Sequence, residues 1–108
     1  MCRARIRELN DRFRRCRQGN GRVVMSAGLN ALGPVVVAEA CAAVRSFDGF
    51  TPDNDPYGEH DFGALVVRGQ RIFWKIDYLD PTLTFGSENP TDETLTCRVL
   101  TIMLAQDT

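Results

Sequence analysis

The sequence predicts an α+β domain with a small, mainly antiparallel three-stranded sheet packed with helices, in the order α-β-α-β-β-α. Three observations predict this class. The N-terminal segment repeats apolar residues at helical spacing, two later segments alternate around a tight turn, and an apolar segment headed by acids follows them. The 108 residues suit a single domain spanning 1–108, and the 44% hydrophobic content is that of an ordinary globular protein.

The first element is a predicted amphipathic helix over residues 3–18. Its apolar positions lie three or four residues apart, so they form one stripe on a helix with 3.6 residues per turn. A turn at residues 18–21 ends it, because glycine suits the left-handed conformation that closes many helices. The stripe consists of Cys2, Ile6, Leu9, Phe13 and Cys16.

A short strand at residues 22–27 and a turn at residues 28–33 lead to a second helix over residues 34–47. Pro34 suits the first turn of a helix, where a backbone N–H is not needed. Nearly all the residues that follow it are apolar. We therefore expect this segment to be a buried central helix.

Two strands at residues 60–68 and 71–79 form a predicted hairpin. Gly69 before Gln70 favours a type II′ turn, which places Leu65 opposite Trp74 on the core face. The other face is half apolar, so either the N-terminal helix covers it or a partner binds it, and we favour the helix. That face carries Phe62, Ala64, Val66, Phe73, Lys75 and Asp77.

The last predicted element is a helix from residue 90 to about residue 105. Asp92 and Glu93 lie at its beginning, where the helix dipole favours anions. Its inner stripe would consist of Leu95, Val99, Ile102 and Met103.

Charge is strongly segregated along the chain. The first 22 residues hold eight arginines and two acids, a net charge of +6, whereas the other 86 residues hold five basic and twelve acidic side chains, a net charge of −7. Asymmetry of this kind concerns partners rather than fold. The arginines Arg12, Arg14, Arg15 and Arg17 are candidates for contacts with phosphates, with a protein partner or with a second copy of the chain.

Nucleic acid is the less favoured of these partners. The acidic remainder of the chain would repel a polyanion, and no helix-turn-helix, zinc-finger or basic-zipper pattern follows the arginines. A protein partner, a homodimer, or plain solvated charge on a packed helix are the alternatives.

An acidic loop precedes the hairpin, and its carboxylates are the second candidate site. Asp53, Asp55, Glu59 and Asp61 could mimic nucleic-acid phosphates on a partner's basic groove. A metal site is less favoured, because the spacing does not fit a calcium-binding loop and strand alternation separates His60 from its neighbours. We predict no metal and no cofactor.

The acid–base group that the sequence offers is His60 with Lys75 and Asp77. The predicted register places His60 and Asp77 on one face, with Lys75 within ion-pair reach of Asp77. No nucleophile accompanies them, so we assign no catalytic residues. An enzyme centred on His60 remains an alternative.

The four cysteines show no metal-binding spacing and predict small, buried, reduced side chains: Cys2, Cys16, Cys41 and Cys97. No apolar run is long enough to span a membrane, and the charged N-terminus does not suit a signal peptide. We expect a cytoplasmic protein with no membrane contact.

Long strings of the sequence carry a family resemblance: RIRELNDRFRR, GRVVMSAGLNALG, DNDPYGEHDFGALVVRGQRIFWKIDYLDPTLTFGS and RVLTIMLA. Together they resemble domain of unknown function 3768, a family of small bacterial proteins carried on chromosomes, plasmids and prophages. The resemblance implies an intact domain and assigns no catalytic residues. Small families on mobile elements often block host defence complexes, anti-CRISPR proteins among them.

From these features we expect a non-enzymatic protein-binding module. The partner class that they favour is a nucleic-acid-targeting host defence complex, which the protein would inhibit through its acidic surface. The alternatives are a nucleic-acid-binding accessory protein that uses the arginine helix and a metal-dependent enzyme centred on His60.

Overall fold

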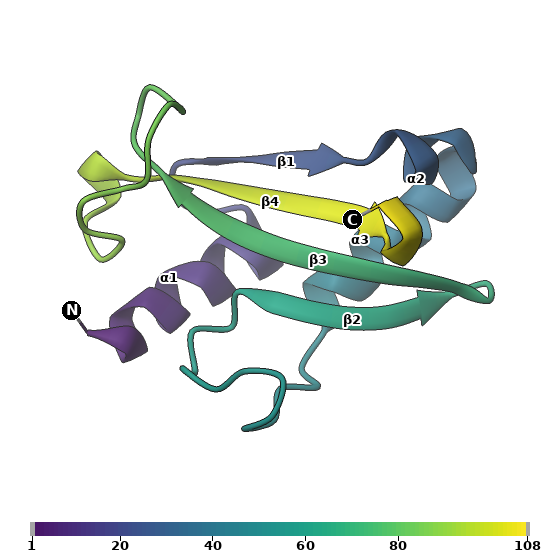
Figure 1. Cartoon of the computed structure of the whole chain (residues 1–108), viewed down its shortest axis with the longest axis horizontal. Helices are drawn as coiled ribbons and strands as arrows, with labels where there is room; N and C mark the ends of the chain where they lie inside the picture. The colour runs from purple at the N-terminus through teal and green to yellow at the C-terminus, as the bar shows by residue number, and fades with distance from the viewer. Residues whose placement is uncertain (1, 108) are drawn as a thin grey trace.

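The computed structural model describes residues 2–107 and has two layers, a four-stranded sheet and three helices packed on one of its faces (Figure 1). The strand order is β1-β4-β3-β2, with β1 parallel to β4 and the other pairs antiparallel. The α+β class is confirmed, but the sheet is mixed and has four strands rather than three. The elements are α1 (Arg3–Cys16), β1 (Gly21–Met25), α2 (Ala27–Ala31), α3 (Pro34–Ser46), β2 (Phe62–Val67), β3 (Gln70–Leu79), η1 (Glu93–Leu95), β4 (Cys97–Leu104) and η2 (Ala105–Asp107).

The predicted last helix is wrong, because its second half is the central strand β4. Arg98, Leu100, Ile102 and Leu104 point into the core, and the residues between them belong to the other face. Strand β4 lies between β1 and β3, and most of its residues on both faces are apolar. A short apolar run of this kind also fits helical spacing. Asp92, at the beginning of the predicted helix, caps only the short turn η1, where its carboxylate accepts the backbone N–H of Thr94 at 2.9 Å.

Helix α1 matches its prediction closely. Ile6, Leu9 and Phe13 are buried, and the helix ends at Cys16. Its C-cap is Arg17 in the left-handed conformation (φ 57°) rather than one of the glycines that follow.

Helix α3 begins at Pro34 as predicted, but it is not a buried central helix. Only Ala40 and Val44 are buried, and the Val35 side chain is 58% exposed. The helix lies at the outside of the helical layer, since only one of its faces meets the sheet.

The hairpin forms with a register two residues from the predicted one. Its turn residues are Arg68 and Gly69, both with positive φ (50° and 77°), as in a type I′ turn, so Leu65 pairs with Ile72 rather than with Trp74. A shift of two residues leaves every side chain on its predicted face. The burial of Trp74, which is 0% exposed, is therefore confirmed.

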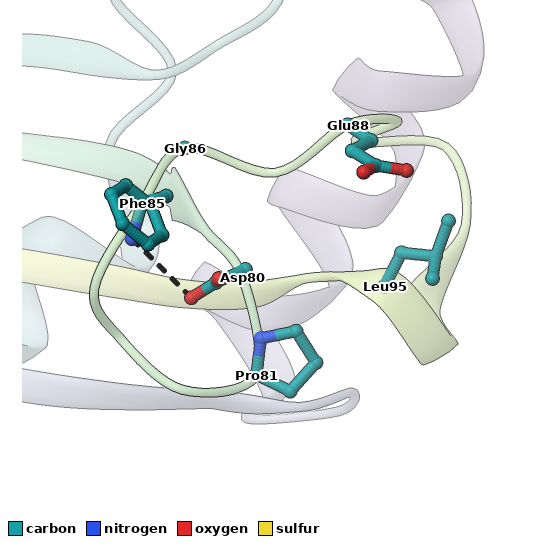
Figure 2. Close-up of a pocket in the computed structure, with 6 residues that line it drawn as sticks. All are labelled: Asp80, Pro81, Phe85, Gly86, Glu88 and Leu95. Atoms are coloured by element: carbon teal, nitrogen blue, oxygen red, sulfur yellow. Dashed lines mark hydrogen bonds between the residues drawn. The ribbon is translucent and has the colours of Figure 1, made fainter.

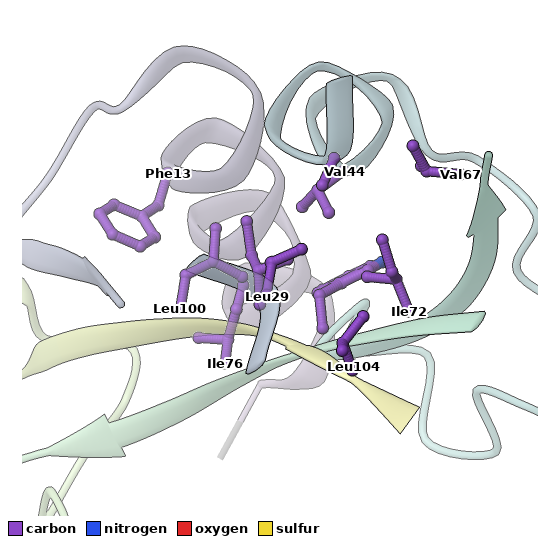
Figure 3. Close-up of a cluster of buried hydrophobic side chains, with 11 residues drawn as sticks. Phe13, Leu29, Val44, Val67, Ile72, Ile76, Leu100 and Leu104 are labelled. Atoms are coloured by element: carbon purple, nitrogen blue, oxygen red, sulfur yellow. The ribbon is translucent and has the colours of Figure 1, made fainter. Parts of the chain in front are cut away.

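One cluster of buried side chains joins all three helices to the sheet (Figure 3). Trp74 lies at its centre, and Gly63 on the neighbouring strand leaves the space that the indole ring fills, because a Cβ at Gly63 would collide with that ring. The cluster contains Phe13, Leu29, Ala40, Val44, Val67, Ile72, Trp74, Ile76, Leu100, Ile102 and Leu104. No helix within residues 2–107 has the length and apolar character needed to cross a membrane.

Candidate functional site

A polar cluster lies beneath α1 and ties it to the sheet. The Asn10 amide donates to the backbone carbonyl of Glu59 and to the Tyr78 hydroxyl, both at 2.9 Å. Its oxygen accepts from Arg98 Nε at 2.7 Å, and Arg98 Nη2 also donates to the carbonyl of Pro90. Asn10 and Arg98 are buried, so the cluster is a structural connection between helix, loop and sheet.

Two carboxylates share the Tyr78 hydroxyl in this cluster. The hydroxyl lies 2.8 Å from Glu59 Oε1 and 3.2 Å from Asp61 Oδ2. Burial, and secondly the nearby Glu59 charge, raises the pKa of Asp61. Burial also raises the pKa of Tyr78 and lowers the pKa of Arg98. Both carboxylates are thus engaged inside the fold.

His60 lies in the loop before β2, on the side of the sheet that faces α1. Its Nδ1 is 2.9 Å from Asp11 Oδ1, its Nε2 is 3.5 Å from Asp55 Oδ2, and its ring stacks on Phe50 with centroids 3.7 Å apart. The predicted pairing with Asp77 is wrong, because Asp77 belongs to the opposite face of the sheet. The predicted ion pair of Asp77 with Lys75 is present at 3.2 Å.

The four predicted acidic contact residues do not form one exposed surface. Asp53 is exposed, whereas Asp55 accepts the backbone N–H of His60 and keeps only 7% of its side chain exposed. Glu59 and Asp61 are bound by Tyr78 as described. Within residues 2–107, no group of three or more histidine, cysteine, aspartate or glutamate side chains is placed to hold a metal ion.

The four predicted basic residues also divide into two kinds. Arg12 pairs with Glu8 at 2.8 Å, Arg15 donates to the carbonyl of Phe47, and Arg17 donates to that of Arg14, and all three are exposed. Arg14 is 0% exposed, so it cannot contact a phosphate. The expectation for Arg14 is therefore wrong.

Arg14 closes the C-terminal end of α3. Its Nη1 donates to the carbonyls of Val44 and Arg45 at 2.7 and 3.3 Å, where the helix leaves carbonyls without intrahelical partners. Its guanidinium also lies over the rings of Trp74 and Phe50. Burial lowers its pKa, while the Asp11 carboxylate at 3.3 Å opposes that effect.

The sheet face opposite the helices is uncovered, and we call it the open face (Figure 1). The prediction that α1 covers it is wrong, because the apolar stripe of α1 is buried in the core beneath the other face. Val66 is 65% exposed, Val24 46% and Phe62 38%. Strand alternation assigns to the open face Arg22, Val24, Phe62, Ala64, Val66, Arg71, Phe73, Lys75, Asp77, Val99, Thr101 and Met103.

Aromatic and charged groups organise one half of the open face. The rings of Phe62 and Phe73 lie 5.6 Å apart across the hairpin, and the Arg71 guanidinium lies over Phe73 at 5.8 Å. The Lys75–Asp77 ion pair lies further along β3. The face therefore combines apolar side chains with charged ones on the internal strand β3.

A shallow hollow lies beside the loop after β3, lined by Asp80, Pro81, Phe85, Gly86, Glu88 and Leu95 (Figure 2). The Asp80 carboxylate organises the loop by accepting from the Thr82 hydroxyl at 2.8 Å and from the backbone N–H of Thr84 at 3.1 Å. These bonds lower the pKa of Asp80. Phe85 is 71% exposed at the rim, so the hollow is an open surface feature rather than an enclosed pocket.

All four cysteines are free thiols. Cys41 and Cys97 are half-buried, but Cys2 and Cys16 are exposed at the two ends of the α1 stripe. The expectation of burial is wrong for these two, because the core beneath α1 extends only from Ile6 to Phe13.

The buried polar residues of α1 were missed in the sequence, although a signal for them exists. Asn10 and Arg14 follow Ile6 at intervals of four residues, which puts them on the same side of the helix as the apolar stripe. A polar residue in that position is expected to point into the core.

Residues 25–107 match the model of a family described as a protein of unknown function (DUF3768). The match begins at the last residue of β1 and includes the open-face residues of β2, β3 and β4. No curated protein and no solved structure matches the chain.

Proposed function

We propose that this chain, which belongs to the DUF3768 family of proteins of unknown function, is a non-enzymatic module that binds a protein partner through its open face. The observation that carries the proposal is the exposure of Val24, Phe62 and Val66 on a sheet that helices cover on one side only. These side chains lie on the two border strands of the face, with Thr101 and Lys75 between Val24 and Phe62. An uncovered sheet face with exposed apolar side chains is a candidate interaction site.

The chemistry of the open face resembles that of a protein interface. Aromatic residues and arginine are enriched at the centres of interfaces, and here Phe62, Phe73 and Arg71 lie together. Charged groups lie beside them, including the Lys75–Asp77 pair. A partner with an apolar patch and a few acidic groups would complement this arrangement.

We retain as the proposed partner class a bacterial nucleic-acid-targeting defence complex, which the protein would inhibit. The hydrogen bonds of Asp55, Glu59 and Asp61 favour the open face over the acidic loop as the surface that makes the contact. The two surfaces differ in salt dependence, because exposed charges are screened within about 8 Å at physiological ionic strength whereas apolar contacts are not.

The experiment is a pull-down from a bacterial lysate at low and high salt with three baits. They are the wild type, the double variant Val24→Asp/Thr101→Glu on the open face, and Val35→Asp on the exposed side of α3 as a matched control. We expect the wild type and the control to capture the same protein at both salt concentrations, and the double variant to lose it.

Capture by all three baits alike, or by none, would contradict the open-face proposal. A protein captured at low salt only, lost with Asp53→Asn and kept with the double variant would instead support the acidic surface. Each bait must be folded for the comparison to be valid. Folding is first checked by the fluorescence emission of the single tryptophan, the buried Trp74.

A further inference from the structure

One border of the sheet lacks a strand partner and also lacks the features that usually protect such a border. Strand β2 is last in the strand order and pairs with β3 alone. Its sequence, FGALVV, contains no charged residue and no proline. Natural sheets protect their edges with short strands, charges, prolines or bulges. The other border, β1, is shorter and carries Arg22.

The register of the hairpin shows which backbone groups point away from β3. The Asp61 carbonyl accepts the Ile76 N–H at 2.8 Å, and in an antiparallel ladder bonding positions alternate along the strand. Gly63, Leu65 and Val67 therefore bond to β3. The N–H and C=O groups of Phe62, Ala64 and Val66 point outward, and their side chains are exposed on the open face.

We infer that β2 pairs in antiparallel fashion with β2 of a second copy, which makes a two-fold symmetric dimer with one continuous eight-stranded sheet. A two-fold axis at Ala64 places Phe62 of each copy opposite Val66 of the other and uses all three outward positions. Aromatic and β-branched residues are a favourable cross-strand pair. An isologous contact of this kind closes on itself and leaves no β2 edge free.

The pattern of the strand itself favours a second copy as the occupant. Phe62 and Val66 lie two residues on either side of Ala64, so a two-fold axis at Ala64 brings each exposed aromatic residue opposite an exposed β-branched one. The charged residues that flank β2 are already engaged within one copy, since the Tyr78 hydroxyl binds Glu59 and Asp61, and Arg68 is paired with Glu39. Antiparallel pairing of two identical strands satisfies the outward N–H and C=O groups of both copies.

The dimer extends the open face without altering it. The exposed side chains of the two β2 strands lie on the same side of the joined sheet, so the apolar surfaces of the two copies become continuous. One strand edge with its flanking side chains buries no more than about 1,200 Å², the lower end of specific interfaces, so we expect micromolar affinity. The inference does not rest on the function proposed above, because a monomer can also bind a partner through its open face.

The experiment is sedimentation velocity of the full chain from about 5 to 500 µM, on the wild type and three variants. Ala64→Pro removes an outward N–H at an edge position, where proline is tolerated. Val66→Lys keeps the N–H and adds an edge charge of the kind that blocks strand pairing. Val35→Lys on α3 is the matched control.

We expect a reversible monomer–dimer equilibrium in the wild type and in Val35→Lys. Val66→Lys is expected to weaken dimerisation at least tenfold, and Ala64→Pro to remain monomeric with the emission maximum of buried Trp74. If the proline variant fails to fold, Val66→Lys decides. Hydrogen exchange gives an independent readout: amides of residues 62, 64 and 66 become protected as concentration rises, while amides of residues 63, 65 and 67 are protected throughout.

A wild type that stays monomeric at 500 µM would overturn the inference. A dimer that persists in both Ala64→Pro and Val66→Lys would also overturn it, since the contact would then lie elsewhere. A wild type that stays monomeric but still captures a partner through its open face would refute the dimer and leave the proposed function standing. The failures of the two proposals can therefore be told apart.

Discussion

At the scale of single residues, Arg14 shows how a side chain typical of surfaces becomes part of the core. Its guanidinium lies over the Trp74 ring and donates to the last carbonyls of α3, so it connects α1 with α3 and with the buried indole ring. Its four-residue spacing from Asn10 puts both on the inner side of α1. Asn10 thus binds polar groups of the sheet and Arg14 binds those of α3, which an entirely apolar stripe would leave without a partner from α1.

Replacement of Arg14 by alanine is therefore expected to destabilise the fold by about 2–4 kcal/mol. The change leaves a cavity beside Trp74 and removes the donor to the Val44 carbonyl. Urea unfolding followed by tryptophan emission and circular dichroism measures it. Arg15→Ala is the matched control on the exposed side of the same helix and should cost no more than about 0.5 kcal/mol; equal effects of the two changes would refute the structural role of Arg14.

Asp61 gives a pH-dependent prediction. Its pKa is raised by burial and by Glu59, so the folded state holds the proton on this carboxyl more tightly than the unfolded chain does. The contribution of Asp61 to stability is fully present below its unfolded pKa and is lost as pH rises through the folded pKa. Asp61→Asn removes this loss, so its free energy of unfolding should gain on that of the wild type as pH rises from about 4 to 7.

Urea unfolding at several pH values measures the difference between the two proteins. Asp53→Asn, at an exposed position of the same loop, is the control and should run parallel to the wild type. A free energy of unfolding of Asp61→Asn that, relative to the wild type, stays constant or falls as pH rises would show that Asp61 ionises without cost in the folded state.

At the scale of elements, the sequence predicts segments with strong local signals and misses those that depend on distant neighbours. The stripe of α1, the proline that begins α3 and the faces of the hairpin are local patterns, and the structure agrees with them. Strand β4 lies between β1 and β3, and only that tertiary position explains why its apolar run is extended rather than helical.

The candidate sites were predictable only in part for the same reason. The sequence identifies the half-apolar hairpin face but cannot show which layer α1 joins. It identifies Asp55, Glu59 and Asp61 as a group. The conformation of the loop places the His60 N–H that binds Asp55, and the hairpin register places the Tyr78 hydroxyl that binds Glu59 and Asp61. A register error of two residues preserves faces but not neighbours.

The hairpin turn provides the prediction at this scale. Arg68 and Gly69 both have positive φ, a conformation that glycine adopts without cost and that alanine adopts poorly. Gly69→Ala is expected to destabilise the protein by about 1 kcal/mol, although a Cβ there would meet no neighbouring atom. Gly69→Asn should cost less, because asparagine tolerates the left-handed region. Thermal unfolding of both variants tests the order; a neutral Gly69→Ala would contradict the positive φ at this position.

At the scale of the whole molecule, only part of the charge asymmetry of the sequence appears on the molecular surface. Arg14 is inside, and Arg12 is paired with Glu8. In the acidic part of the chain, Glu59 and Asp61 are held by Tyr78, and Glu39 is paired with Arg68 at 2.8 Å. Burial of Arg14 and the hydrogen bonds of Glu59 and Asp61 reduce the charge that each part displays, whereas the Arg12–Glu8 and Glu39–Arg68 pairs join charges already balanced within one part.

We accordingly expect no sub-micromolar binding to duplex DNA at low salt. With Arg14 buried, the predicted set is reduced to Arg12, Arg15 and Arg17, so this set contributes at most three contacts and about −2.7 to the slope of log K against log salt. Gel shifts over a salt series measure this, with Arg12→Gln/Arg15→Gln/Arg17→Gln as the comparison. Tight binding by the wild type that the triple variant loses would restore the nucleic-acid alternative.

The parallel pairing of β1 with β4 also sets the order in which the chain can fold. Gly21 pairs with Arg98, so this contact closes a loop containing most of the chain, whereas the β2–β3 hairpin closes across two residues. Contacts between distant segments form slowly, because loop closure costs entropy before pairing repays it. In stopped-flow experiments we expect Gly69→Ala to slow refolding and Val24→Ala to accelerate unfolding. Strand β1 is then the last strand to pair with β4 during folding and the first to separate from it during unfolding, so the native state opens at β1.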